Sequence, residues 1–405
     1  MTRMKTQYGK EWFSNIGGDI PAGVVSSFAV IPEVIGFTIV AGVDPILGLY
    51  TSIAFLLIIS FIGGRPAMVS AGAGSMAVVA APLIASHGLD YLFCAVFVAG
   101  LIQIALGVMG IGHLLKRIPK PIVMGFVDGL AAIIFMSQLT SIADNTVDST
   151  EGMVMMASYI VIGLAVILLF PRITKAIPST LMAIAVVTIV DLVIGSNGTV
   201  VMISDLGDIS AGWPDFSIPS LLTDTDALSV ILPTSLSLAF VGLLETSLTL
   251  KLVDSMTDTK GNNTTECVAQ GIANTACGTI GAIPGCAMIG QAVTNVKSGG
   301  RGRLSTFVSG MMLVILLAYG SELLGMIPLA ALVAVMIYVS FVTFDWNGLK
   351  RMYDERDAQS LKNTSVTILT FIIILLTKNL AYGAAGGLLL MGIYRMTEHH
   401  VINHT

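Results

Sequence analysis

Apolar stretches long enough to cross a bilayer recur along the whole chain, and charged residues, Gly or Pro bound each of them. A transmembrane α-helix needs about 20 consecutive apolar residues. The pattern predicts twelve such spans, near residues 20–41, 45–62, 89–115, 119–142, 153–170, 176–195, 227–250, 266–281, 303–324, 327–342, 361–377 and 380–397. We therefore predict an all-α, polytopic membrane protein.

Two further apolar segments, 68–85 and 286–296, are rich in Gly, Ala and Ser. Each follows a turn that contains Gly and Pro, at residues 63–66 and 281–284. Because Gly and Pro interrupt regular helices, we predict that these two segments are broken or half-length helices. Counting them gives 14 transmembrane segments, with both termini on the same side of the membrane.

The distribution of basic residues supports this count. With the N-terminus in the cytoplasm, 19 of the 20 Lys and Arg residues fall on the cytoplasmic side, and Lys378 is the exception. Basic residues concentrate in cytoplasmic loops of membrane proteins. The predicted outer connections 143–152 and 196–226 contain acidic residues but no Lys or Arg. We expect a multi-pass protein of a cell membrane, such as a bacterial inner membrane, with both termini cytoplasmic.

Composition excludes several functional classes. Hydrophobic residues make up 55% of the chain and charged residues 11%, where a soluble domain carries roughly 25% charged residues. The four cysteines have no metal-ligand or disulfide spacing, so we interpret them as small core residues. The sequence shows no cleavable signal peptide, no basic patch suited to nucleic acid, and no nucleophile–base pair, metal motif or phosphate loop. We expect neither an enzyme nor a cofactor.

The two halves of the predicted fold resemble one another. With seven segments in each half, the second half crosses the membrane in the opposite sense, as in many secondary transporters. Each first segment carries one carboxylate in an apolar run, Glu33 and Glu245, and each third segment is the Gly-rich one. Broken helices expose backbone N–H groups near the middle of the membrane, where they attract anions. We therefore predict a small anionic substrate.

Four strings of sequence carry a family resemblance. Residues 31–50, IPEVIGFTIVAGVDPILGLY, resemble the first-span signature of the SulP anion transporters, a family of sulfate permeases, cyanobacterial bicarbonate transporters and prestin-like proteins. Residues 63–76 resemble its third segment, 241–258 its eighth, and 285–305 its tenth with the following loop. The strings occur in the family's order and extend over nearly the whole chain.

The resemblance implies a 7+7 inverted repeat in which a core domain moves against a gate domain, in an elevator-type cycle. The substrate would lie between the facing N-termini of segments three and ten. The expected division is a cytoplasmic N-terminus (1–17), a first core section with segments 1–4 (18–117), a first gate section with segments 5–7 (118–195), an extracytoplasmic connection (196–226), a second core section with segments 8–11 (227–324), a second gate section with segments 12–14 (325–397) and a cytoplasmic tail (398–405). Family members usually carry a STAS domain after the last span, and we expect this chain to be a membrane domain without one.

The candidate substrate-binding residues lie around the starts of segments three and ten. Small residues there let an anion approach the backbone N–H groups, although Gly and Ala equally permit close helix packing in lipid. Many family members have an Arg in segment ten, where this chain has Gln291, which offers hydrogen bonds without a charge. Ser75 is a weaker candidate, as a hydroxyl donor. The predicted set is Ser70, Ala73, Gly74, Ala287, Met288, Ile289, Gly290 and Gln291.

Three residues are candidates for ion coupling. Glu33 and Glu245 are carboxylates in apolar runs, where burying an ionised group is costly. Each could instead only bridge or cap neighbouring helices. Thr249 lies one helical turn after Glu245. Sodium-coupled bicarbonate transporters of the family have Asp and Thr at this spacing, so the Glu in this chain favours protons over sodium.

Other polar residues in the chain are weaker candidates. Asp128 and Asp191 are acids within predicted gate segments, and Asp128 either lines the pathway or pairs across helices. The charged segment 350–357 is interpreted as a solvated loop. The tail residues His399, His400 and His404 are interpreted as solvated, although short His-rich tails can bind metals.

The predicted function is secondary active transport of a small anion: sulfate, bicarbonate or a dicarboxylate such as fumarate. Coupling to protons through Glu245 or Glu33 is favoured, since protonation near the site would remove a repulsive charge. The alternatives are an uncoupled anion channel or exchanger, and a nucleobase:cation symporter of the same architecture. The resemblance also suggests a homodimer, which the sequence alone does not establish.

Overall fold

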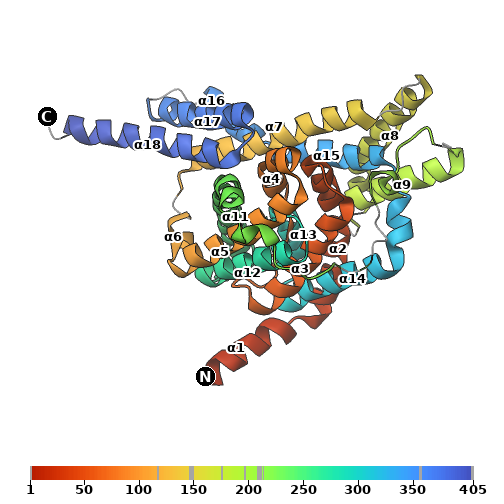
Figure 1. Cartoon of the computed structure of the whole chain (residues 1–405), viewed down its shortest axis with the longest axis horizontal. Helices are drawn as coiled ribbons and strands as arrows, with labels where there is room; N and C mark the ends of the chain where they lie inside the picture. Colours follow the sequence, from red (N-terminus) through yellow and green to blue (C-terminus); the bar gives the residue numbers. More distant parts are fainter. Residues whose placement is uncertain are drawn as a thin grey trace.

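A computed structural model of the protein describes residues 2–115, 118–145, 150–174, 177–195, 198–207, 212, 214–354 and 358–402. Helices dominate the described part, together with two short strands (Figure 1). The elements are α1 (Thr2–Phe13), α2 (Ile16–Ala41), α3 (Pro45–Ile62), β1 (Ser70–Gly72), α4 (Gly74–His87), α5 (Leu89–Val108), α6 (Ile111–Leu115), α7 (Lys120–Asn145), α8 (Thr150–Leu169), α9 (Ser179–Ile194), α10 (Ile203–Leu206), α11 (Thr225–Thr257), α12 (Asn263–Thr279), β2 (Gly285–Ala287), α13 (Ile289–Lys297), α14 (Arg303–Gly325), α15 (Leu329–Thr343), α16 (Trp346–Asp354), α17 (Ala358–Thr377) and α18 (Leu380–Ile402), with 3-10 turns at Phe170–Arg172 and Ser220–Thr223.

The helical membrane fold predicted from the apolar pattern is confirmed. Within the described residues, eight helices are long and apolar enough to cross a membrane: α2, α3, α5, α7, α8 with the following 3-10 turn, α11, α14 and α17. The apolar helices α4, α9 and α15 are shorter. The total of 14 spans stays a prediction.

Two predicted spans differ from the helices observed. Residues 89–115 do not form one helix, because α5 ends at Val108 and α6 begins at Ile111. Gly110 between them has φ of +75°, in the left-handed region that a right-handed helix does not contain. The span predicted at 227–250 is shorter than α11, which extends over 33 residues.

The Gly-rich segments are half-length, as predicted. The third segment consists of β1 followed by the 14-residue α4, and the tenth of β2 followed by the nine-residue α13. β1 and β2 pair antiparallel, with Ser70 opposite Ala287 and Gly72 opposite Gly285. Two segments more than 200 residues apart in sequence therefore meet at one point.

The helices pack mainly in two groups. In one group, α5 and α11 pack against α12, and α2 and α3 pack against α14. In the other, α15 and α17 pack against α7, α8 packs against α9 and α15, and α17 packs against α18. In Figure 1 the second group extends along the upper part of the view, above α11, α12 and α3. The half-length helices belong to the first group, where α13 packs on α2 and α11, and α4 on α2 and α11.

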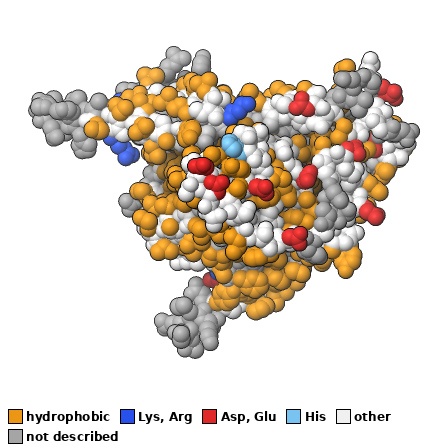
Figure 2. Space-filling model, viewed as in Figure 1, with side chains coloured by type: hydrophobic (Ala, Val, Ile, Leu, Met, Phe, Trp, Pro, Cys, Tyr) orange, Lys and Arg blue, Asp and Glu red, His pale blue; other side chains and the backbone are white. Residues whose placement is uncertain are grey.

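Hydrophobic side chains cover much of the molecular surface (Figure 2). Ile173, Tyr319 and Leu389 are among those that are more than 70% exposed. A soluble protein rarely exposes continuous apolar surface on this scale. The surface fits a protein whose flanks contact lipid.

Candidate functional site

Two helix N-termini meet at the centre of the first helix group. The ladder between β1 and β2 brings the ends of the two strands together, and α4 and α13 begin directly beyond them. Ala73 and Met288 precede the two helices in extended conformation, and neither helix has a hydrogen bond from a capping side chain. The first N–H groups of a helix have no partner within the helix, so these two termini offer free donors and two positive dipole ends.

A cavity of about 1120 Å³ lies beside these N-termini. It is lined by elements of both helix groups, including α2, α4, α11 and α13 from the first and α7, α9 and α15 from the second. Eight of the eleven residues predicted for substrate or ion binding line it: Glu33, Ala73, Gly74, Glu245, Met288, Ile289, Gly290 and Gln291. The structure therefore brings together residues from four separate regions of the sequence.

Three predicted site residues do not line this cavity. Ser70 and Ala287 lie in the strand ladder, where the Ser70 hydroxyl accepts a hydrogen bond from Gln270 Nε2 at 2.7 Å. The Thr249 hydroxyl donates to the backbone carbonyl of Glu245 at 2.9 Å and lies 3.4 Å from that of Ala287. Ser70 and Thr249 thus make hydrogen bonds within the protein, and a direct contact of any of the three with substrate or ion stays a prediction.

The carboxylate of Glu245 binds side chains from both broken segments. The Ser75 hydroxyl, in the first turn of α4, donates to Glu245 Oε2. The Cys286 thiol, in β2, lies 3.2 Å from the same oxygen. Glu245 thus links α11 to the starts of both half-length helices, while Thr249, its predicted partner, contacts only backbone oxygens.

Cys286 is a site residue that the sequence reasoning missed. It was interpreted as a small core residue, and its side chain is indeed fully buried. Its place next to a Gly in the tenth-segment string was the available signal, but nothing in the sequence indicates that this thiol reaches a carboxylate on another helix.

Gln291 is a buried amide that faces the cavity. Its residue is only 1% exposed, and it lines the cavity. The Glu33 carboxylate, on α2, lies beside it. The Gln291 amide can therefore donate either to the Glu33 carboxylate or to an acceptor oxygen of a ligand in the cavity.

The two glycines at the helix starts differ in the space around them. A Cβ added to Gly74 would lie 2.6 Å from the Phe37 ring, whereas one added to Gly290 would meet no atom within 4 Å. Gly74 is therefore needed for packing. Gly290 faces open space at the start of α13.

The charged side chains that line the cavity are two carboxylates and one ammonium group. Glu33 and Glu245 lie near the helix N-termini, and Lys297 is an exposed residue in the last turn of α13. Lys297 was counted from the sequence only as one contributor to the cytoplasmic charge bias. The fold places it at the same cavity, one helix length from Gly290.

Asp128 pairs across elements and does not line the cavity. Its Oδ1 accepts the backbone N–H of Asp345 at 2.8 Å, at the start of α16. Asp191 accepts a hydrogen bond from the Tyr159 hydroxyl at 3.1 Å and lies on a separate pocket near α10. Residues 350–354 of the segment interpreted as a loop are helical and belong to α16, so that prediction was wrong for this part. The side chains of residues 351–357 and of His399, His400 and His404 lie outside the described ones, so their solvation stays a prediction.

The sequence matches a known family over most of its length. The profile of the sulfate permease family matches residues 16–361. The candidate sulfate transporter YbaR of Bacillus subtilis (strain 168) is 44% identical over 98% of this chain and 80% of its own length. The bicarbonate transporter BicA of Synechocystis is 28% identical over 90% of this chain and 68% of its length.

Solved structures agree with these matches. The transmembrane domain of a cyanobacterial bicarbonate transporter BicA superposes with a TM-score of 0.79 at 26% identity, covering 90% of this chain and 98% of that one. SLC26A9 superposes with a TM-score of 0.80 at 16% identity, covering 95% of this chain and 66% of that one. The latter likeness concerns the fold alone. With a family profile that covers most of its length and a 44% identical relative, the chain belongs to the sulfate permease family.

Proposed function

We propose that this protein is a secondary active transporter that couples movement of a small anion to protons by elevator-type alternating access. Family membership makes it a membrane transporter of anions and not an enzyme. It also favours an anion over the nucleobase of the alternative symporter hypothesis. The substrate is proposed to be sulfate, bicarbonate or a dicarboxylate, since relatives are named for sulfate and for bicarbonate.

The observation that carries the proposal is the pair of uncapped helix N-termini that face one cavity beside Gln291. Backbone N–H groups and helix dipoles bind anions without a fixed positive charge. The amide of Gln291, beside Glu33, adds a donor from the first turn of α13. The site suits a compact anion with several acceptor oxygens.

The coupling mechanism in the proposal depends on Glu245. Its carboxylate contacts Ser75, in the same turn of α4 that would bind the anion. When Glu245 is ionised it repels an anion there, and a bound proton removes the repulsion. Anion and proton then favour each other's binding, and by linkage the effect is reciprocal.

The packing of the helices into two groups supports alternating access. The cavity is lined from both helix groups and includes Thr174, Ile177 and Ser298. Thr174 and Ser298 belong to connections that the charge bias predicts to be cytoplasmic, and Ile177 lies at the end of the predicted span 176–195 that is next to one of them. We propose that this conformation is open to the cytoplasm, and that sliding of the first group against the second closes it.

The test is uptake of radiolabelled sulfate, bicarbonate and fumarate into proteoliposomes, each with and without an inward proton or sodium gradient. Accumulation above equilibrium with a proton gradient alone is expected for one anion. Protein-free liposomes are the control. Accumulation with a sodium gradient alone would mean that sodium, and not the proton, is the coupling ion. Equilibration that neither gradient changes would indicate a channel or exchanger. No uptake of any of the three anions would refute the proposal.

A further inference from the structure

Three polar side chains form one buried stripe along α12. Glu266, Gln270 and Asn274 are spaced four residues apart, so they lie on one face of the helix, and all three are 0% exposed. α12 packs closely on α5 and α3. Buried polar groups in such a position require partners, and each of the three has partners in the two broken segments or in the turn before β1.

Asn274 binds both backbone groups of Gly285, the first residue of β2. Its Nδ2 donates to the Gly285 carbonyl at 3.0 Å, and its Oδ1 accepts the Gly285 N–H at 3.0 Å. Nδ2 also donates to Gln103 Oε1 on α5 at 2.8 Å. A single amide therefore fixes the strand that leads, four residues later, to the start of α13.

Gln270 and Glu266 bind the other broken segment. Gln270 Nε2 donates to the Ser70 hydroxyl of β1 at 2.7 Å and to Glu266 Oε1 at 2.8 Å. Glu266 Oε2 accepts the backbone N–H groups of Gly64 and Arg65, at 2.7 and 3.0 Å. The same helix face thus binds the turn before β1, β1 itself and β2.

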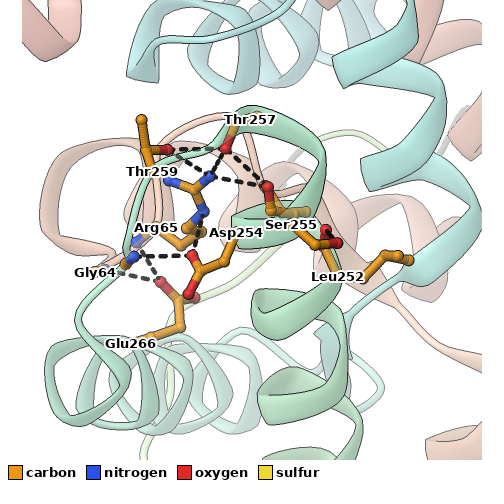
Figure 3. A network of polar contacts seen from close by, with 10 residues as sticks. Gly64, Arg65, Leu252, Asp254, Ser255, Thr257, Thr259 and Glu266 are labelled. Atoms are coloured by element: carbon orange, nitrogen blue, oxygen red, sulfur yellow. Dashed lines mark hydrogen bonds and ion pairs between the residues drawn. The ribbon is translucent and has the colours of Figure 1, made fainter.

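Figure 3 shows the end of this network nearest Arg65. The Arg65 guanidinium points away from Glu266, toward Asp254 at 3.1 Å and toward Thr257, the last residue of α11, and Thr259, which follows it. The turn that leads into β1 is therefore tied at its backbone to α12 and at its side chain to α11.

The matching helix of the first half, α3, holds the broken segments by fewer hydrogen bonds. In the inverted repeat, α3 takes the place of α12. Its Ser52 hydroxyl lies 3.4 Å from the Gly72 N–H, and its Thr51 hydroxyl donates to the Ile283 carbonyl at 2.7 Å. Gly72 and Gly285 are opposite each other in the ladder, but only Gly285 has both backbone groups bound by one side chain.

We infer that the Glu266–Gln270–Asn274 stripe of α12 positions the two helix N-termini of the substrate site, and that Asn274 is the positioning residue for α13. None of the three lines the cavity, so they act through the backbone and not by touching the substrate. Loss of the Asn274 contacts is expected to loosen β2 and to misplace the first-turn donors of α13. This inference deepens the proposed function and rests on it for its transport readout.

The test compares Asn274→Asp with Thr275→Val. Asn274→Asp keeps the acceptor for the Gly285 N–H and the size of the side chain but removes the donor to the Gly285 carbonyl and to Gln103 Oε1. Thr275→Val is the matched control, because the Thr275 hydroxyl donates to the Gly271 carbonyl of its own helix at 2.9 Å. The readouts are the KM and Vmax of uptake of the anion identified above, and hydrogen exchange of residues 285–291.

Asn274→Asp is expected to raise KM about fivefold to tenfold with Vmax changed less than twofold, and to speed hydrogen exchange locally at residues 285–291. Thr275→Val should change neither. An unchanged KM, or exchange that rises equally throughout α12 and its neighbours, would overturn the inference, as would failure of Asn274→Asp to fold when Thr275→Val folds. If the wild type transports none of the anions tested, the proposed function fails, and the exchange data alone decide whether Asn274 positions β2.

Discussion

Glu245 and Glu33 are acidic residues in a cavity that we expect to bind an anion. Together with Lys297 they are the charged side chains that line the cavity. Two ionised carboxylates near a bound anion would repel it strongly in a medium of low dielectric constant. Protonation of at least one is the simplest way to make anion binding favourable, which is why we place the coupling function at Glu245.

Replacing Glu245 by Gln is expected to uncouple transport from pH. The wild type should take up its anion about tenfold faster at pH 5.5 than at pH 7.5, because the proton and the anion assist each other's binding. Glu245→Gln, which is permanently neutral, should transport at a rate nearly independent of pH and should not accumulate the anion against its gradient. The measurement is initial uptake as a function of pH.

The control for that experiment is Glu322→Gln, at an exposed position on a separate pocket. It should retain the pH dependence of the wild type. A Glu245→Gln variant with unchanged pH dependence would remove Glu245 from the mechanism.

Lys297 is expected to attract the anion into the cavity. Lys297→Gln should raise KM about twofold to fivefold at low salt, and the effect should shrink at high ionic strength because exposed charges are screened. Vmax should change little. Lys251→Gln, an exposed Lys at α11 that does not line the cavity, is the matched control, and an equal KM change in both variants would argue against a specific role for Lys297.

The sequence indicated which residues of a segment are candidates for function better than it indicated which residues of other segments they contact. Glu245 stood out because a carboxylate in an apolar run is rare. Helical spacing suggested Thr249 as its partner, yet Ser75 and Cys286 contact it. Such contacts depend on how β1 and β2 meet, and the local sequence does not contain that information.

Among the elements, the half-length helices α4 and α13 were the most predictable, because Gly and Pro mark the turns before them. The break between α5 and α6 was missed because Gly110 lies in a continuous apolar stretch. The strands were not predicted either. Each is three residues long and exists only because the other segment supplies its partner.

Gly290→Ala is expected to weaken anion binding without lowering the stability of the protein. A methyl group fits there without contact, and Ala favours helix over Gly, so the melting temperature should be unchanged or higher. The methyl group would nevertheless occupy the space where the anion approaches the first turn of α13, so KM should rise about tenfold or more. Gly392→Ala, in α18 and also free of contacts, should leave both quantities unchanged; a normal KM in Gly290→Ala would place the anion elsewhere.

Arg65→Leu should destabilise the turn that leads into β1. It removes the ion pair with Asp254 at 3.1 Å and the hydrogen bonds to the Val253 carbonyl and the Thr259 hydroxyl. Asp254 keeps some solvent contact, with 20% side-chain exposure, so we expect a loss of about 2 kcal/mol. Thermal unfolding in detergent measures it, with the exposed Lys260→Gln in the same loop as control. Equal melting temperatures for Arg65→Leu and the wild type would contradict this role.

For the whole molecule, the repeated pattern of the two halves was the most informative feature of the sequence. Together with the family resemblance it predicted that the third and tenth segments face each other, and β1 and β2 do pair. It did not predict which face of α12 binds both, because Glu266, Gln270 and Asn274 look like ordinary polar positions in a moderately apolar segment. Their role becomes apparent only when both broken segments are in place.

We propose that the anion binds between the N-termini of α4 and α13. The most direct test is a cryo-EM map of the protein in lipid nanodiscs, saturated with the anion that the uptake assay identifies. We predict density about 3 Å from the first-turn N–H groups of both helices and from Gln291 Nε2. Density for the anion elsewhere in the protein, with this position empty, would show that the two N-termini are not the binding site.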